Sequence, residues 1–310
     1  MAEAVLRGEP RPLGRALSMI ENGHPSSHDL LHRLYDPARN STTLGITGPP
    51  GAGKSSLTNR LITQWRQAGR RVGVVCVDPT SPFSGGALLG DRLRMQSHAS
   101  DPGVFIRSMG SRGHLGGLAG ASRDAGEVLA SAGFDPVVLE TVGVGQGEVE
   151  VATIADVTLL VLVPGLGDDV QTMKAGIMEI GDIIVLNKAD RPGIDQLETA
   201  VRMSFELMAE SADPPPVVRC SAQTGQGIAK LAELVDTVAG QAGSRPERAA
   251  RRARLMLDRI LAEKGLEMAQ RMLEHQYGSR ESAVEMVLKG TQTPYGIGER
   301  LTRAAKEMLE

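Results

Sequence analysis

The stretch Gly48-Pro49-Pro50-Gly51-Ala52-Gly53-Lys54-Ser55-Ser56 decides the fold of this chain. It follows a short apolar run at residues 44–47 and opens a helical pattern over residues 57–67. A glycine-rich turn of this spacing between a strand and a helix is the P-loop. Its backbone N–H groups and the positive end of the helix dipole form a cradle for phosphate groups. We expect Lys54 to reach the outer phosphates and the Ser55 hydroxyl to coordinate Mg²⁺.

Apolar runs alternate with helical patterns behind this motif. The runs are rich in Val, Ile and Leu at consecutive positions, which is typical of parallel strands covered on both faces. They lie at 44–47, 72–77, 104–107, 137–139, 157–163, 183–186 and 217–220. Helical patterns fall between them at 57–67, 118–132, 171–178, 195–208 and 227–238. We therefore predict an α/β fold, a P-loop NTPase with a mainly parallel sheet flanked by helices.

Purely helical patterns flank this region on both sides. Residues 1–42 are expected to form a helical extension on the P-loop domain, which we place at residues 43–240. Residues 241–310 begin with a long helical pattern and continue with shorter ones, at 244–276, 279–289 and 296–309. A long helix outside the αβ alternation needs a partner surface, which the shorter helices or a second chain could supply.

Composition narrows the class of protein. Hydrophobic residues make up 41 % of the 310 residues and charged residues 23 %, which is ordinary for a folded globular chain. A formal net charge of -3 argues against a general nucleic-acid or anionic-membrane binder. No apolar run approaches a membrane span, and residues 1–30 lack a signal-peptide core, so we expect a cytoplasmic protein. Cys76 and Cys220 lie in apolar runs and are expected in the core.

Two short segments predict recognition of guanine. Asn187-Lys188-Ala189-Asp190 follows one apolar run, and Ser221-Ala222 follows the next. The Asp190 carboxylate can accept hydrogen bonds from N1 and the 2-amino group of guanine, which adenine does not offer in that arrangement. The Lys188 stem can cover the ring, and the Ala222 N–H can donate to guanine O6. Together with the P-loop, they indicate GTP and GDP as ligands.

The residues between these two regions are expected to sense the γ-phosphate. Asp78 ends one apolar run, Asp91 follows in a glycine-rich segment, and Glu140 ends a further run. Three carboxylates and Ser55 exceed what Mg²⁺ can bind directly beside phosphate, so some must act through water. The N–H of Gly143 is well placed to meet the γ-phosphate.

A familiar hydrolytic glutamine is missing, because Val144 follows Gly143. Intrinsic hydrolysis should therefore be slow and depend on a partner or a second loop. One candidate is the loop at 164–174, which carries charges of both signs and two glycines. On its residues alone, this loop is equally well a plain turn between a strand and a helix with a capping Asp.

With these motifs the chain resembles the MeaB/ArgK family of P-loop GTPases over nearly its whole length. The most specific segments are DPTSP at 78–82, GGALLGDRLRM at 85–95, ETVGVGQ at 140–146 and GLGDDVQTMKAG at 165–176. The resemblance implies a chaperone of an adenosylcobalamin-dependent acyl-CoA mutase that gates cofactor delivery and protects or rescues the enzyme. It also implies GTP hydrolysis stimulated by the mutase, and a homodimer formed largely through the C-terminal helices.

The resemblance also assigns site residues. The metal side would comprise Ser55, Asp78, Asp91 and Glu140. An additional switch would comprise Asp168, Asp169, Gln171 and Lys174. The residues expected to act in hydrolysis are Lys54, Asp91, Glu140, Gly143 and Lys174. No Asp-x-His-x-x-Gly segment is present, so we expect the mutase, and not this chain, to bind cobalamin.

Two other functions remain as alternatives. A GTPase that loads nickel into an apo-enzyme would need a Cys/His site, whereas the six histidines of this chain form no cluster in the sequence. A small-molecule kinase would need a base for its second substrate, and no carboxylate stands out for that role. Within the family, the partner could be a methylmalonyl-, isobutyryl-, 2-hydroxyisobutyryl- or ethylmalonyl-CoA mutase.

Overall fold

The structure is a computed structural model, and it describes residues 1–36, 39, 41–78, 96–98, 100–110, 117–141, 147–165, 178–208, 214–241 and 245–307. Six predicted site residues lie outside these ranges: Asp91, Gly143, Asp168, Asp169, Gln171 and Lys174. The predicted helix at 171–178 also falls outside them, except for Met178, which begins a short 3₁₀ turn, η2 (Met178–Ile180). The chain divides into two compact units, Met1–Arg252 and Ala253–Glu310.

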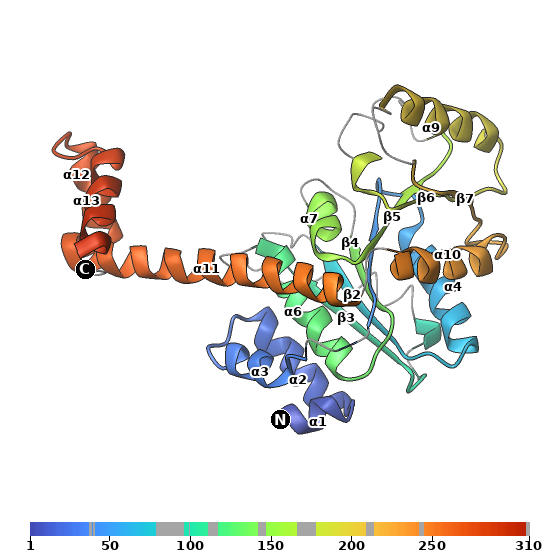
Figure 1. The fold of residues 1–310 in the computed structure, drawn as a ribbon, viewed down its shortest axis with the longest axis horizontal. Coiled ribbons are helices and arrows are strands. Elements are labelled where there is room, and N and C mark those ends of the chain that lie inside the picture. The colour runs from blue at the N-terminus through green and yellow to red at the C-terminus, as the bar shows by residue number, and fades with distance from the viewer. Residues whose placement is uncertain are drawn as a thin grey trace. The chain divides into compact units, whose positions relative to one another are not determined.

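The first unit is built on one parallel sheet of seven strands, ordered β3-β2-β4-β1-β5-β6-β7 (Figure 1). Every pair of neighbouring strands is parallel. The strands are β1 (Thr43–Thr47), β2 (Val72–Asp78), β3 (Val104–Gly110), β4 (Val137–Thr141), β5 (Val157–Leu162), β6 (Ile183–Leu186) and β7 (Val217–Arg219). The predicted fold class is confirmed, with β1 at the centre and its carboxyl end beside those of β4 and β5.

Helices α4 (Lys54–Gln67) and α10 (Ile228–Gln241) lie side by side on one face of the sheet (Figure 1). Leu57 and Leu61 of α4 share a core cluster with Leu231 and Val235 of α10 and with strand residues such as Ile46. Their spacing of four residues puts each pair on one helix face. This apolar contact holds α4, which starts at the P-loop, against α10, which follows the base-side loop that contains Ser221 and Ala222.

The opposite face carries α6 (Gly117–Ser131) and α7 (Gly147–Ile154), while α9 (Ile194–Met208) covers β5 and β6. Helix α7 was not predicted. It packs against β1 at Gly45, where a Cβ would lie 2.7 Å from Val151 Cγ1 and 3.0 Å from Ala155 Cβ. A glycine in a strand interior often marks such a close approach, so Gly45 indicated that another element packs closely on β1.

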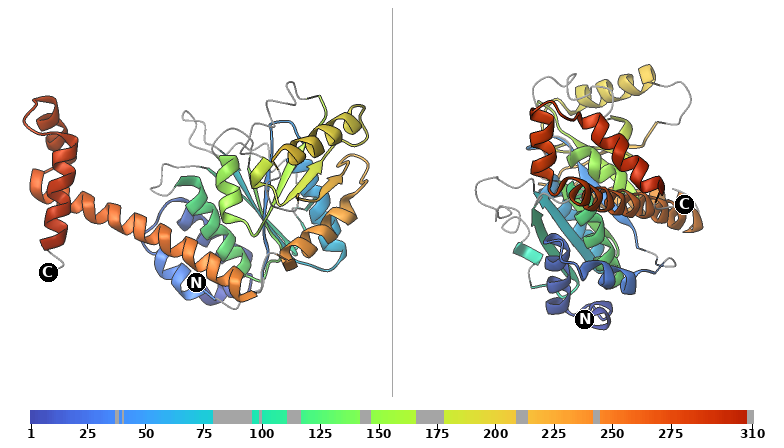
Figure 2. Two further views of the ribbon diagram at one scale, coloured as in Figure 1. Left: turned by 45° about the horizontal axis from the view of Figure 1, so that its top comes forward. Right: turned by 90° about the vertical axis from the view of Figure 1, so that its left-hand side faces the viewer.

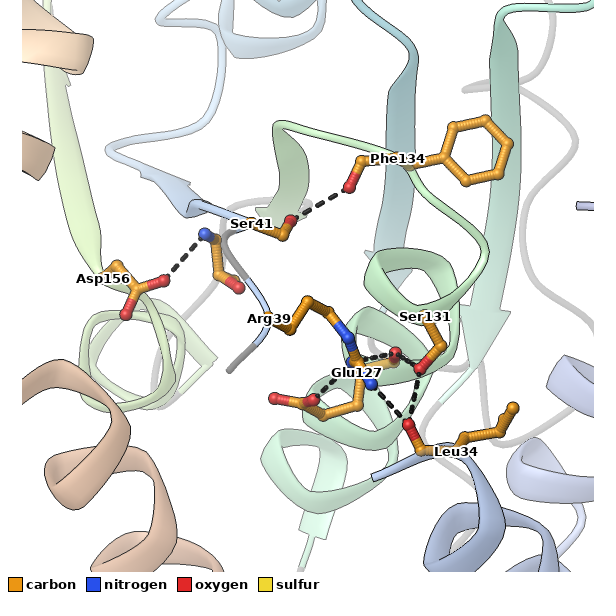
Figure 3. A network of polar contacts seen from close by, with 8 residues as sticks. Leu34, Arg39, Ser41, Glu127, Ser131, Phe134 and Asp156 are labelled. Carbon is orange, nitrogen blue, oxygen red and sulfur yellow. Dashed lines mark hydrogen bonds and ion pairs between the residues drawn. The ribbon is translucent and has the colours of Figure 1, made fainter. Parts of the chain in front are cut away.

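The N-terminal helices α1 (Ala2–Leu6), α2 (Pro10–Glu21) and α3 (Ser27–Leu34) share a core cluster with α6 and the β2–β3 edge. Figure 3 shows the polar link that follows α3. Arg39 donates to the carbonyl and the carboxylate of Glu127 at 2.9 and 3.0 Å, and to the carbonyl of Leu34. Ser41 Oγ donates to Phe134 O at 2.9 Å. Helices α1 to α3 therefore pack on α6 and the β2–β3 edge within the first unit.

The second unit consists of helices, drawn in orange to red in Figure 2. It contains most of α11 (Arg245–Tyr277), together with α12 (Arg280–Leu288) and α13 (Pro294–Glu307). Ser279 caps α12 by accepting a hydrogen bond from the Ser282 N–H, as an N-cap serine does. Several large apolar side chains of these helices are exposed: Leu257, Leu261, Leu266, Met268, Val284, Met286, Leu288 and Tyr295. In the part of the chain that the structure describes, no helix is long and apolar enough to cross a membrane.

Candidate nucleotide-binding site at the carboxyl edge of the sheet

The P-loop connects the end of β1 to the start of α4, as its sequence predicted. Gly51 and Gly53 have positive φ angles of 77° and 86°, which L side chains rarely adopt. Gly48 has a positive φ of 138° as well, and a Cβ there would lie 2.2 Å from the Val161 carbonyl oxygen of β5. Gly53 caps α4 in the left-handed conformation. The turn therefore places the first N–H groups of α4 toward the concave side of the loop, as phosphate binding requires.

Lys54 and Ser55 begin α4 and are both buried. Lys54 Nζ donates to the carbonyls of Gly48 at 2.5 Å and Pro49 at 3.2 Å, so its ammonium group lies over the loop. Ser55 Oγ donates to Glu140 Oε1 at 2.5 Å. Glu140, at the end of β4, is only 2 % exposed. The structure thus brings together two oxygen donors from the predicted metal side, and such hard oxygen ligands suit Mg²⁺.

The other two predicted metal-side residues are Asp78 and Asp91. Asp78 is the last residue of β2, whose backbone pairs with Gly110 of β3. Asp91 lies outside the described residues. No group of three or more His, Cys, Asp or Glu side chains arranged to hold a metal occurs in the described ranges. Ser55 and Glu140 are therefore the pair that carries the Mg²⁺ assignment here.

The two base-side loops meet the P-loop at the same sheet edge. Asn187, 1 % exposed, donates from Nδ2 to Ala52 O at 2.8 Å and accepts at Oδ1 from the Ala222 N–H at 3.2 Å. Lys188 has a positive φ of 59°, and its Nζ donates to Gly51 O at 2.7 Å. The predicted residues are thus neighbours, although Asn187 lies 135 positions beyond Ala52. In this arrangement the Ala222 N–H is engaged by Asn187, so guanine O6 would share or take over that donor.

Asp190 is exposed at the end of the Asn-Lys-x-Asp segment. A hydrogen bond from the Ser221 side chain is the largest cause that lowers the pKa of Asp190, and Arg191 and Lys188 act in the same direction. Asp190 therefore stays ionised at neutral pH. Ser221 itself is fully buried, and its Oγ also accepts from the Thr224 N–H at 3.1 Å. An ionised, oriented carboxylate is what two N–H donors of guanine require.

Sequence reasoning missed two features of this site. It assigned Asn187 to the base alone, whereas the side chain also braces the P-loop at Ala52. It gave no role to Arg60 of α4, which donates to the carbonyls of Ala222 and Gln223, both at 2.7 Å. No local pattern could have revealed Arg60, because its partners lie 162 and 163 positions away.

Comparison with known protein families matches residues 13–274 to the family described as methylmalonyl Co-A mutase-associated GTPase MeaB. This chain belongs to the MeaB family. The matched range includes the P-loop, Glu140 and both base-side loops. The resemblance inferred from the sequence motifs is thereby confirmed, and the chain is a GTPase of a family associated with methylmalonyl-CoA mutase.

Individual relatives of this MeaB-family protein carry GTPase names. A protein of Pyrococcus abyssi named as a GTPase is 50 % identical over 235 residues, 74 % of this chain and 72 % of that protein. GTPase ArgK of Escherichia coli is 37 % identical over 243 residues, 74 % of this chain and 73 % of that protein. A solved structure described as LAO/AO transport system kinase aligns with a TM-score of 0.66 at 24 % identity, over 98 % of this chain and 96 % of that one. This last likeness shows that the fold is shared.

Membership of this family implies binding of GTP and GDP with Mg²⁺, and the described residues fit both. All three P-loop glycines hold positive φ angles, Lys54 supplies a buried cation, and Ser55 and Glu140 supply oxygen ligands. A bound Mg²⁺ would neutralise the phosphate charge that develops during hydrolysis.

Proposed function

We propose that this MeaB-family GTPase is a chaperone of an adenosylcobalamin-dependent acyl-CoA mutase of the methylmalonyl-CoA mutase type. In this role it gates the loading of the cofactor and protects or reactivates the mutase. The observation that carries the proposal is the family match over residues 13–274, because its description names a methylmalonyl-CoA mutase-associated GTPase. Cobalamin would be bound by the mutase, since this chain has no Asp-x-His-x-x-Gly segment.

The proposal assigns each part of the site a task. The P-loop, residues Gly48 to Ser56, would hold the phosphates, with Lys54 on the outer ones. Mg²⁺ would be held by Ser55 and Glu140, with Asp78 and Asp91 acting directly or through water. The guanine base would be read by Asn187, Lys188, Asp190, Ser221 and Ala222. The short bond between Ser55 Oγ and Glu140 Oε1, 2.5 Å, supports this use of the metal side.

Nucleotide state would be passed to the mutase by loops near the γ-phosphate. The Gly143 N–H would meet this phosphate, and the segment from Asp168 to Lys174 would form the coupling switch. Because no glutamine follows Gly143, hydrolysis by the chain alone should be slow and should rise when the mutase is bound. The proposed organisation is an extension at 1–42, a GTPase domain at 43–240 and a dimerisation region at 241–310.

The coupling is tested by measuring GTP turnover with and without purified methylmalonyl-CoA mutase. We expect the mutase to stimulate the wild-type protein, and Lys174→Ala to lose most of the stimulation while keeping its GDP affinity. Lys230→Ala, the same change at an exposed position of α10, is the matched control and should respond like the wild type. Absence of stimulation in the wild type would refute the chaperone proposal. An equal response of Lys174→Ala would remove only this residue from the switch.

A homodimer is part of the proposal. The exposed apolar side chains of the second unit support it, since Leu257 and Leu261 of α11 are 56 % and 60 % exposed. A groove of about 770 Å³ lies between α11 and α13 and is lined by Met268, Met272 and Ala304 among others. We propose it as a binding surface for a second copy of this chain. Sedimentation analysis should find a dimer for the wild type and a monomer for Leu261→Asp. An intact dimer in this variant would place the contact elsewhere.

A further inference from the structure

Arg60 makes an unusual pair of contacts for an exposed side chain. It lies on α4, and its guanidinium donates from Nε to Ala222 O and from Nη2 to Gln223 O, each at 2.7 Å. Two donors of one planar group thus hold two consecutive carbonyls of the base-side loop. Such a fork fixes direction as well as distance, which a single ammonium cannot do.

The loop that Arg60 holds has an internal frame of its own. The Ser221 N–H donates to Gln226 O at 2.9 Å, and the Gly225 N–H donates to Ser221 O at 2.8 Å. The Thr224 N–H donates to Ser221 Oγ at 3.1 Å. These bonds define the shape of the turn but not its place relative to the P-loop. The place of the turn is fixed by Asn187 and Arg60, since each forms a hydrogen bond that joins the turn to another element.

Helix α4 gives Arg60 its importance. The helix begins at Lys54 and Ser55, and Arg60 follows about 9 Å further along its axis. The same helix therefore carries Lys54 and Ser55 at its start and, through Arg60, forms hydrogen bonds with the base-side loop further along. The packing of α4 against α10, which follows the same loop, keeps this distance constant (Figure 1).

We propose that Arg60 is a positioning residue for guanine recognition, holding the Ser221-Ala222 segment at the spacing that a nucleotide bound at the P-loop requires. The inference rests on the proposed guanine site and adds a residue to it. Arg60 does not touch the nucleotide in this scheme. It acts on the Ala222 N–H and, through Ser221, on the carboxylate of Asp190.

The test compares the affinities for GDP and ADP, measured by calorimetry with Mg²⁺, in wild type, Arg60→Ala and Arg60→Lys. We expect Arg60→Ala to bind GDP about tenfold more weakly, with ADP affinity changed less than about twofold, because ADP does not use the guanine contacts. In turnover assays, the KM for GTP should rise with little change in kcat. Arg60→Lys keeps the charge but not the fork, and should lose about three- to tenfold in GDP affinity.

Arg66→Ala is the matched control on the same helix. Arg66 binds Asp101 at 2.9 and 3.0 Å, at the other end of α4, so its loss should lower thermal stability without changing the ratio of GDP to ADP affinity. An Arg60→Ala protein with lowered stability and an unchanged ratio would overturn the proposal and leave Arg60 a purely structural contact. Should Arg60→Ala fail to fold, Arg60→Lys gives the same decision. A wild type that binds ADP as tightly as GDP would instead refute the guanine site itself.

Discussion

Replacing Gly53 by Ala separates two reasons for glycine in the P-loop, with Gly51→Ala as the control. Both positions have positive φ angles, 86° and 77°. A Cβ at Gly51 would meet nothing within 4 Å, whereas one at Gly53 would lie 2.7 Å from Asn187 Nδ2. The two variants therefore share the backbone strain, and only Gly53→Ala also displaces a buried side chain.

The size of the difference follows from these contacts. An L residue in the left-handed region costs about 1–2 kcal/mol, which both variants lose. In Gly53→Ala the Asn187 amide must also move, which weakens its bonds to Ala52 O at 2.8 Å and from Ala222 N at 3.2 Å. Each such bond contributes about 1 kcal/mol net. We expect Gly51→Ala to lose about 1–2 kcal/mol and Gly53→Ala about 2–4 kcal/mol.

Thermal unfolding without nucleotide, followed by circular dichroism, measures both losses. A domain of this size loses about 2–4 °C in Tm per kcal/mol, so Gly53→Ala should melt about 2–8 °C below Gly51→Ala. The reasoning also predicts coupling, because removing Asn187 removes the obstacle. In an Asn187→Ala background, Gly53→Ala should cost no more than Gly51→Ala. Equal Tm values for the two single variants, or an undiminished cost in that background, would refute the role given to Asn187.

Three further predictions concern charge and thiol chemistry. Lys54→Ala should stay folded but lose tight GDP binding in calorimetry, and unchanged affinity would contradict the P-loop assignment. Cys76 and Cys220 are both buried, and burial raises the pKa of Cys220 to about 12, so neither thiol should react with a disulfide reagent at pH 8 until denaturant is added. A hydrogen bond from Arg66 lowers the pKa of Asp101 in the folded protein. The ionised carboxylate therefore stabilises the folded state at pH values above the unfolded pKa, and this stabilisation is lost as the pH falls through the folded pKa. Asp101→Asn should therefore lower stability by at most about 1 kcal/mol at pH 7, and the difference from wild type should shrink below about pH 4.

Most of the sheet could be predicted because its strands are buried on both faces and read as continuous apolar runs. Strand β3 is the instructive exception. The predicted run ends at Arg107, but the strand continues to Gly110. Arg107 fits inside it because Glu21 of α2 accepts its Nη2 at 2.6 Å and also receives the Gly110 N–H at 3.3 Å. An ion pair between residues so far apart leaves no mark in a local pattern.

Helix α7 was not predicted because its local pattern is misleading. Val149 and Val151 alternate with polar residues, as is typical of a strand. Tertiary packing decides the matter, because Val151 and Ile154 are buried against the sheet and the glycine at position 45 leaves room for a helix. In the candidate site, residue types with a fixed chemical task were predictable from their spacing. The supporting contacts of Asn187 and Arg60 were not, because they depend on where the fold places a carbonyl group.

Side-chain hydrogen bonds join the P-loop to the base-side loops of this site. Asn187 and Lys188 are neighbours in sequence, and their side chains donate to two neighbouring P-loop carbonyls, those of Ala52 and Gly51. Arg60 closes the ring from the far side, since it joins the P-loop helix to the carbonyl of Ala222. A shift of the P-loop must therefore move the base-side loops or break charge-assisted hydrogen bonds. We therefore expect the change between nucleotide states to occur outside this ring of contacts, on the Glu140 side, where the metal and the γ-phosphate would meet.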